Sequence, residues 1–317
     1  MARRADEPTP GLLLVDKPAG WTSHDVVARA RRLLNTRKVG HAGTLDPMAT
    51  GLLVLGVGRG TRLLTYVTGH DKSYDATLRL GQSTVTDDAE GEVTSTADAS
   101  GVTDDALAAA IAGLTGDILQ VPSSVSAIKV NGERSYARVR AGEDVALAAR
   151  PVTVSRFAVR DTRRGDGVID VDAAIDVSSG TYVRALARDL GAVLGVGGHL
   201  TALRRTSVGR FDVAHALTVE ALGALADSGA ALPLIPLDDA AKAALPELAL
   251  SAEEATSLSY GKPLKERAAE LISPEHDDDF THDAVAVAPD GRVIAIVRRV
   301  RGAAKPVIVF APAGQES

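Results

Sequence analysis

Cysteine is absent from the 317-residue chain, which excludes disulfides, zinc ribbons, iron–sulfur clusters and thiol nucleophiles. Any nucleophile must therefore act through oxygen or nitrogen. Aromatic residues make up only 3% of the chain, so a sheet that stacks several nucleic-acid bases is not expected. No apolar run approaches the roughly 18 residues of a membrane span, and no apolar segment of a secretory signal follows the basic start MARRADEPTP. We expect a cytoplasmic protein without membrane contact.

Charge is distributed unevenly along a chain whose formal net charge is −6. Residues 1–79 carry 12 Lys and Arg against 7 Asp and Glu, residues 129–164 carry 9 against 4, and residues 184–210 carry 5 against 1. Residues 80–128 hold 8 acidic residues and no basic one. Of the 35 basic residues 27 are Arg, whose planar guanidinium suits phosphate. Such segregation is typical of a nucleic-acid groove, although helices with one basic face produce similar blocks.

Hydrophobic periodicity predicts a mixture of strands and helices. Buried or alternating strands are predicted over residues 11–15, 52–58, 72–81 and 168–177. Helices are predicted after an N-cap at Thr22 or Ser23, over residues 103–114, and after an N-cap at Thr181. In the last helix the expected buried stripe is Val183, Leu186, Leu190 and Val193, with Arg184 and Arg188 on another face. Because strands and helices do not alternate regularly, the sequence favours an α+β fold over a doubly wound sheet.

The chain length and one proline-rich stretch indicate two domains. PLIPLDDAAKAALP, at residues 233–246, contains three prolines and changes the composition. Beyond it, AVAVAPDGRVIAIVRRV predicts a β-hairpin that turns at residues 289–291. We therefore expect a larger domain over residues 1–235 and a small β-rich domain over residues 245–317.

Two motifs favour ordinary structural explanations. GVGRGTR, at residues 56–62, lacks the third glycine of a dinucleotide-binding loop, so it predicts a tight turn into a helix. The acidic and histidine cluster at residues 276–283 matches no known spacing of metal ligands and favours a solvated loop. The phosphate-binding loop of kinases and ATPases is absent from the sequence.

GHAGTLDPMATG, at residues 40–51, places one aspartate inside a tightly shaped loop. Asp46 is either a presented carboxylate or the first residue of an Asx-turn before Pro47. Taken with GLLLVDKPAGWTSHDVV, DKSYDATLRLG and SSGTYVRALARDLG, the loop resembles the TruB family of pseudouridine synthases. The match is in order and correctly spaced over roughly residues 10–212. This family isomerises the T-loop uridine of tRNA, at position 55.

The resemblance implies an α+β catalytic domain on a mixed sheet, without a metal or organic cofactor. It implies that Asp46 is the nucleophile, that Tyr74 stacks on the target base, and that Arg184 pairs with the aspartate. The implied substrate-binding residues are Lys17, His41, Tyr182 and Leu203. His41 matches a histidine that takes the place of the extruded base, and Leu203 matches a leucine that packs in the same pocket.

The sequence pattern alone favours an ordinary structural role for each of these side chains. Tyr74 and Leu203 would be core residues, Arg184 a surface charge of a helix, His41 a loop histidine and Lys17 a solvated turn lysine. The functional interpretation gains weight because these residues occur together, in the order that the family has.

The resemblance also implies the partners. The stand-alone bacterial members bind the T-arm of tRNA without a guide RNA, and we expect a monomer. Residues 120–150 match the insertion with which they grip RNA, but QVPSSVSAIK carries Ser123 and Val125 where the family often has proline and tyrosine. The C-terminal hairpin region resembles a PUA-type RNA-binding module only weakly.

Two other functions stay open on the sequence. A non-catalytic RNA-binding protein would keep the basic blocks without needing Asp46. A glycosidase-like hydrolase would need a second carboxylate, and the sequence around Asp46 offers no obvious partner.

Overall fold

The computed structural model describes residues 9–123, 129–130, 133–134, 147–265, 267 and 283–312. In the first half of the chain the elements are β1 (Gly11–Lys17), α1 (Ser23–Leu33), β2 (Val39–Ala42), β3 (Thr50–Val57), η1 (Gly58–Leu63), α2 (Leu64–Gly69), β4 (Lys72–Leu80), β5 (Gln82–Thr84), β6 (Val93–Thr96), α3 (Asp104–Gly113), β7 (Gly116–Gln120), β8 (Lys129–Val130), β9 (Glu133–Arg134) and β10 (Arg150–Gly165). In the second half they are β11 (Val168–Val177), α5 (Val183–Val193), β12 (Gly198–Val208), β13 (Phe211–Asp212), η2 (Val213–His215), β14 (Leu217–Thr218), α6 (Val219–Asp227), β15 (Ile235–Pro236), α7 (Leu237–Ala244), β16 (Glu247–Ala249), α8 (Ala252–Ser259), β17 (Asp283–Val287), β18 (Val293–Val300) and β19 (Ala303–Val309).

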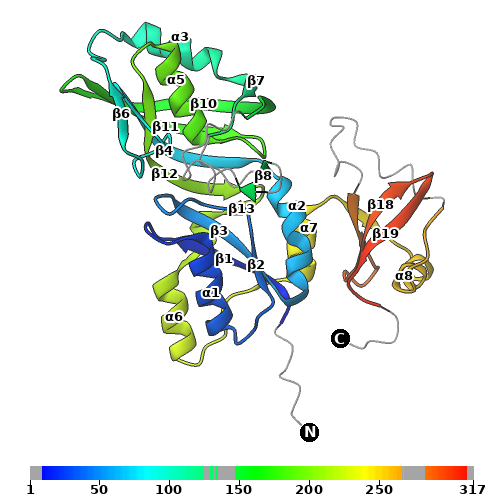
Figure 1. Cartoon of the computed structure of the whole chain (residues 1–317). Helices are drawn as coiled ribbons and strands as arrows, with labels where there is room; N and C mark the ends of the chain where they lie inside the picture. The colour runs from blue at the N-terminus through cyan, green and yellow to red at the C-terminus, as the bar shows by residue number, and fades with distance from the viewer. Residues whose placement is uncertain are drawn as a thin grey trace.

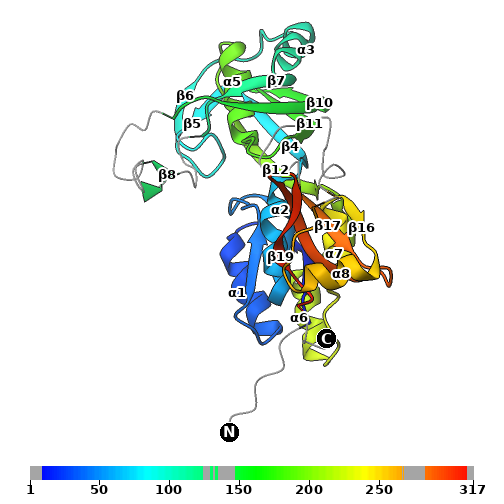
Figure 2. The ribbon, with the colours of Figure 1, turned by 90° about the vertical axis from the view of Figure 1, so that its right-hand side faces the viewer.

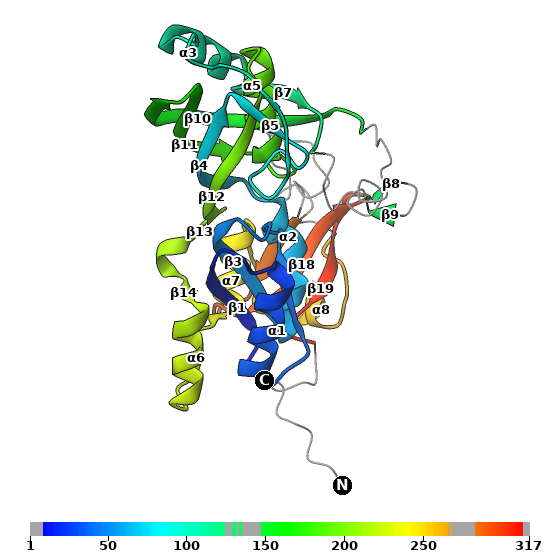
Figure 3. The same cartoon turned by 60° about the vertical axis from the view of Figure 1, so that its left-hand side comes forward.

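A mixed sheet of 11 strands forms the centre of the molecule (Figure 1). Eight of them follow the order β14-β1-β3-β12-β4-β11-β10-β7, and β13, β15 and β2 pair with β12, β1 and β3 respectively. Strands β1 and β3 lie in its lower part with α1 and α6, and β4, β10 and β11 lie in its upper part with α3 and α5 (Figure 3). The two parts join where β3 and β12 pair in parallel, at Thr50 with Arg204 and Gly51 with Arg205. A Cβ on Gly51 would lie 2.3 Å from the Arg205 carbonyl oxygen, so only glycine permits this close join. The predicted α+β class is confirmed.

The predicted strand at residues 72–81 is confirmed as β4, whose side chains alternate between buried and partly exposed. Its buried side chains include Tyr74, Ala76, Leu78 and Leu80. The turn predicted from GVGRGTR is also confirmed, since η1 there leads directly into α2. The predicted hairpin is β17 and β18, and the sequence missed β19, which pairs with β18.

Predicted helix starts are confirmed in one case and wrong in another. Thr22 caps α1 in a reciprocal capping box with Asp25. Thr181 does not cap α5, because the helix begins one residue later and Tyr182 holds the cap position without a side-chain hydrogen bond. Val193 was also misplaced: it is the last residue of the helix and is 64% exposed.

The C-terminal sheet has the order β16-β17-β18-β19 and lies beside the lower part of the main sheet (Figure 2). One apolar cluster joins the two sheets; its members include Leu12, Leu14, Leu52, Val54, Val67, Ala240, Ala244, Val285, Ile296 and Phe310. The proline-rich stretch forms β15, which pairs with β1, and α7, which belongs to this cluster. The boundary between residues 1–235 and 245–317 stays a prediction.

Two sequence-based statements concern parts of the chain with limited description. Most of the predicted insertion at residues 120–150 lies outside the described residues, as does the cluster at residues 276–283 apart from Asp283. No helix within the described ranges has the length and apolar character to cross a membrane.

Candidate active site

The loop between β2 and β3 carries Asp46, and buried side chains fix its backbone. Arg205, only 1% exposed, donates from Nη2 to the Gly43 carbonyl at 3.0 Å and from Nε to the Leu52 carbonyl at 2.8 Å. Ser23 Oγ donates to the Leu45 carbonyl at 3.1 Å and accepts from the Leu45 amide at 2.9 Å. Because these groups are buried, water does not compete for the carbonyls. The backbone on both sides of the aspartate is therefore held in one conformation.

Lys17 holds the same loop from the end of β1. Its side chain is fully buried, and Nζ donates to the carbonyls of Pro18 at 2.9 Å, Trp21 at 2.6 Å and Pro47 at 3.2 Å. Burial lowers the pKa of Lys17 to about 8, and the nearby Asp46 opposes that shift. The reading of Lys17 as a solvated turn lysine is wrong. Its contacts support a role in placing the Asp46 loop.

Arg184 connects Asp46 to a second carboxylate. Its Nε lies 3.1 Å from Asp46 Oδ2, and its Nη1 lies 3.2 Å from Asp88 Oδ2 and donates to the Thr86 carbonyl at 2.9 Å. The Arg184 and Asp88 side chains are 6% and 3% exposed, whereas Asp46 is 37% exposed. The guanidinium is thus fixed behind the loop, and only Asp46 of the two carboxylates reaches open space.

Asp88 is a residue that the sequence analysis missed. It accepts hydrogen bonds from Thr86 Oγ1 and, at 3.0 Å, from the Glu90 amide. Burial raises the pKa of Asp46, Arg184 opposes the rise, and the charge of Asp88 adds to it. Sequence spacing does not indicate that Asp88 pairs with Arg184, because Arg184 lies 96 positions further along the chain.

A parallel contact anchors the neighbouring aspartate. Arg188, one turn after Arg184 on α5, reaches Asp87 Oδ2 at 3.3 Å, and Ser123 Oγ donates to the same oxygen at 2.8 Å. The i, i+4 spacing of the two arginines thus faces a pair of adjacent aspartates. The segment that contains Asp87 and Asp88 is therefore held against the start of α5.

A cavity of about 320 Å³ opens in front of Asp46. Five of the seven residues predicted for the site line it: Asp46, Tyr74, Tyr182, Arg184 and Leu203. Lys17 lies buried behind the loop, and His41 lines a neighbouring cavity that shares Thr68 and Ser179 with the first.

His41 differs from the other predicted residues in its surroundings. Burial lowers the pKa of its imidazole, and the nearby His24 charge acts in the same direction. The two rings meet edge to face, with centroids 5.6 Å apart. These conditions favour a neutral His41.

Lys72 and Arg205 also line the cavity, and the sequence analysis did not assign either to the site. Lys72 Nζ donates to the carbonyls of Thr68 at 2.9 Å and His70 at 2.7 Å, and burial lowers its pKa to about 8. Two cations therefore flank the side of the cavity away from the Asp46–Arg184 pair. Lys72 begins the alternating strand that predicted Tyr74, so the same pattern could have found it.

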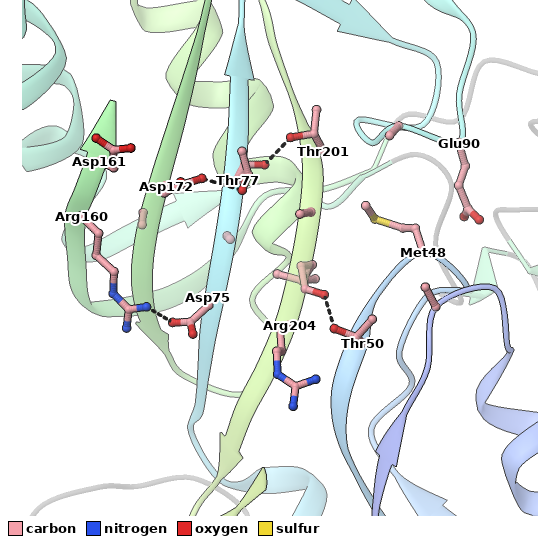
Figure 4. Close-up of a pocket in the computed structure, with 16 residues that line it drawn as sticks. Met48, Thr50, Asp75, Thr77, Glu90, Arg160, Asp161, Asp172, Thr201 and Arg204 are labelled. Atoms are coloured by element: carbon pink, nitrogen blue, oxygen red, sulfur yellow. Dashed lines mark hydrogen bonds and ion pairs between the residues drawn. The ribbon is translucent and has the colours of Figure 1, made fainter. Parts of the chain in front are cut away.

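A larger cavity of about 700 Å³ lies next to the first and shares Leu203 with it. Figure 4 shows that some of its polar side chains already pair with one another. Arg160 Nη1 lies 2.8 Å from Asp75 Oδ1, and Thr77 Oγ1 donates to Asp172 Oδ1 at 2.7 Å. The smaller cavity, with a partly exposed carboxylate beside a buried guanidinium, is the better candidate for chemistry.

No group of three or more potential ligands is placed to hold a metal ion within the described part of the chain. Asp283, the described end of the acidic cluster, forms an ion pair with Arg298 at 2.6 Å.

Family models match nearly all of the chain. Residues 31–183 match the N-terminal domain of the TruB family pseudouridylate synthases, residues 184–240 match the tRNA pseudouridylate synthase B C-terminal domain, and residues 245–311 match the C-terminal domain of tRNA pseudouridine synthase II.

Similar proteins span almost the same length as this chain. A tRNA pseudouridine synthase B from Arthrobacter sp. (strain FB24) is 57% identical over 96% of this chain and 98% of its own. The protein of the same name from Nocardia farcinica is 55% identical over 98% and 96%. Among solved structures, a chain of a Cbf5-Nop10-Gar1 complex covers 95% of this chain, and 85% of its own, with a TM-score of 0.69 at 23% identity, which shows a shared fold.

Proposed function

The chain belongs to the TruB family of pseudouridine synthases, and we propose that it converts the uridine at position 55 in the T-loop of tRNA to pseudouridine. Relatives named tRNA pseudouridine synthase B are more than half identical to it over nearly their whole length. The chain is therefore an enzyme that isomerises uridine in tRNA. The position of the uridine and the roles of individual residues are the proposal.

The observation that carries the proposal is the Asp46–Arg184 pair at the mouth of a cavity that Tyr74 lines. The reaction breaks the bond between N1 and C1′, turns the base and joins C5 to C1′; C5 loses a proton and N1 takes one up. A nucleophile must hold one fragment while the base turns. Asp46 suits this role because its carboxylate is partly exposed and its backbone is fixed on both sides.

Arg184 keeps this nucleophile ionised. Burial and the Asp88 charge both raise the pKa of Asp46; the Arg184 guanidinium opposes them most strongly, and the Lys17 charge adds to its effect. Nε and Nη1 contact Asp46 and Asp88 respectively, so one planar side chain orients both carboxylates. A lysine would supply the charge without the planar two-donor fork, so it would hold the two carboxylates less firmly.

Tyr74, Tyr182 and Leu203 form the proposed binding surface for the base. Turning a uridine out of the T-loop costs a few kcal/mol of stacking. Contact of the base with an aromatic ring returns about 1–3 kcal/mol, so one or two aromatic residues offset this cost. We assign His41, in the adjoining cavity, to the space that the extruded uridine leaves in the loop.

The two alternative functions are less well supported. A non-catalytic RNA-binding protein does not need a buried arginine that orients two carboxylates. The sequence offered no second carboxylate for a hydrolase, and the structure supplies Asp88. That side chain is 3% exposed and does not line the cavity, so it is poorly placed to protonate a leaving group.

Tritium release from tRNA labelled at uridine C5 tests the proposal, because substitution at C5 frees that atom. The parent protein should release tritium from a transcript with uridine at position 55 and not from one with cytidine there. Asp46→Asn keeps the size of the side chain but removes the nucleophile, so release should fall below detection while tRNA binding is retained.

Asp16→Asn is a matched control, since Asp16 forms an ion pair with Arg204 at 2.7 Å and does not line the cavity. It should keep the parental rate. Release by Asp46→Asn at a comparable rate would refute the nucleophile assignment. A parent protein that binds tRNA without releasing tritium would support the alternative of a non-catalytic RNA-binding protein.

A further inference from the structure

Helix α2 forms part of the active-site wall and also contacts the C-terminal sheet. Thr68 lies near its end and lines both the catalytic cavity and the adjoining cavity. Tyr66 and Val67 are 6% and 0% exposed and belong to the apolar cluster that includes Val285 and Ile296 of the C-terminal sheet. Figures 1 and 3 both show α2 between the main sheet and β18. A shift of this helix would therefore change the cavity.

A polar triad lies at the contact between α2 and the C-terminal sheet: Tyr66 and Asp283 are buried, and the Arg298 side chain is 36% exposed. The Asp283 carboxylate is fully buried and accepts from Arg298 twice, at 2.6 Å from Nε and 2.8 Å from Nη2. The Tyr66 hydroxyl hydrogen-bonds to the carboxylate and to the guanidinium, and burial together with Asp283 raises the pKa of Tyr66 to about 12. The tyrosine is thus a neutral donor to the buried Asp283 carboxylate at every physiological pH, and it accepts from Arg298.

Two further contacts join the segment before α2 to the same sheet. Arg59 Nη1 donates to the Phe310 carbonyl at 2.9 Å, and Arg62 Nη1 donates to the Val309 carbonyl at 3.4 Å. The helix and its lead-in are therefore attached to the C-terminal sheet at three places, of which the Tyr66 triad is the most buried.

The other end of α2 is attached to the catalytic cavity. The Thr68 carbonyl accepts from Lys72 Nζ at 2.9 Å and from Ser179 Oγ at 2.9 Å. Lys72 begins the strand that carries Tyr74, and Ser179 begins the loop that leads to Arg184. One carbonyl of α2 thus contacts the segments that supply Tyr74 and Arg184.

We infer that Tyr66, Asp283 and Arg298 are positioning residues for the isomerisation, through which the C-terminal domain holds α2 and so sets the geometry of the catalytic cavity. This inference rests on the proposed function. An ion pair such as Asp283–Arg298 contributes little net stability compared with apolar packing, but here it fixes the placement of α2 relative to the C-terminal sheet. The C-terminal domain then contributes to the chemical step as well as to any contact with RNA.

Tyr66→Phe is the sharpest test, because it removes one hydroxyl and leaves the Asp283–Arg298 pair and the apolar packing in place. The single-turnover rate of tritium release at saturating enzyme should fall about fivefold, since a hydrogen bond to a charged group is lost from the contact that holds α2. The tRNA dissociation constant should stay within about twofold of the parental value, because Tyr66 is buried and the partly exposed Arg298 charge is kept.

Tyr260→Phe is the matched control, since it makes the same chemical change in the C-terminal domain at a side chain that is 68% exposed. It should leave the rate and the affinity unchanged. Asp283→Asn should slow the step as well, and the double variant with Tyr66→Phe should show less than the product of the two losses, because both changes act on one contact.

The outcomes separate the inference from the proposed function. An inactive parent protein refutes the proposed function, whereas an active parent with a normal Tyr66→Phe rate overturns the inference alone. A weaker tRNA affinity at an unchanged rate also overturns it. The rates are measured well below the melting temperature of each variant. If cooling restores the parental rate to Tyr66→Phe, the triad only stabilises the fold and the inference fails.

Discussion

Asp88→Asn tests how the buried second carboxylate acts on Asp46, the proposed nucleophile. The amide is nearly isosteric, and its oxygen can still accept from Arg184 Nη1, which lies 3.2 Å from the carboxylate now. The change therefore removes the charge and keeps the contact. A hydrogen bond between charged groups contributes about 1.5–3 kcal/mol and a neutral one about 0.5–1.5 kcal/mol.

The expected loss is thus about 1–1.5 kcal/mol in the placement of Arg184, or about a five- to tenfold slower reaction at neutral pH. The pH dependence should move in the opposite sense. Because the Asp88 charge raises the pKa of Asp46, its removal lowers that pKa, and the nucleophile stays ionised to lower pH. The acid limb of the rate profile should therefore shift toward lower pH.

Single-turnover tritium release between about pH 5 and 8 measures both effects in one experiment. In Asp88→Asn the oxygen that faces Arg184 leaves Nδ2 facing the Glu90 amide, so that amide loses its acceptor in the Asn and the Ala variant alike. Asp88→Ala provides the comparison, because it also removes the contact with Arg184 Nη1 and should be slower than Asp88→Asn. An acid limb that stays in place or moves to higher pH would refute the electrostatic argument, whatever the size of the rate loss.

Two further predictions concern the loop that carries Asp46. Gly43→Ala should lower the turnover number by about tenfold with little change in affinity, because Gly43 has a φ of 77° and a Cβ would lie 3.3 Å from Arg205 Nη1. Steady-state kinetics measures both values, and an equal loss of affinity would contradict this prediction. Lys17→Met should lower the melting temperature at pH 7 by about 4–8 °C, since three buried carbonyls lose their donor at a net cost of about 2 kcal/mol. The pKa of Lys17 falls from 10.5 to about 8 on folding, so this group increases the stability of the parent protein as the pH rises between those values. Lys17→Met should lack that increase when the melting temperatures of both proteins are measured at pH 7 and 10.

The sequence was sufficient where structure depends on local pattern. The strict alternation in β4 placed Tyr74 on the buried face, and the Thr22 capping box located the start of α1. Asp46 and Arg184 came instead from motifs that resemble the TruB family, since no local rule indicates that residues 138 positions apart share a contact. The structure then places the two side chains 3.1 Å from each other.

Local pattern failed for buried polar groups, which look like surface residues in a sequence. Lys17 and Arg205 are among the most buried side chains of the described chain, yet hydropathy places both types at the surface. Their burial depends on backbone carbonyls that the fold collects around them. Asp88 was hidden for the same reason, because its partner is supplied by a helix that follows much later in the chain.

These buried groups also explain how a carboxylate with a raised pKa can serve as the nucleophile. Lys17 and Arg205 donate to carbonyls on either side of Asp46, so its position does not depend on its own charge. The Arg184 guanidinium is fixed by Asp88 and the Thr86 carbonyl, so it need not move when Asp46 forms a bond and loses its charge. A site arranged in this way changes little between the free and the bonded carboxylate, which keeps the reorganisation during the reaction small.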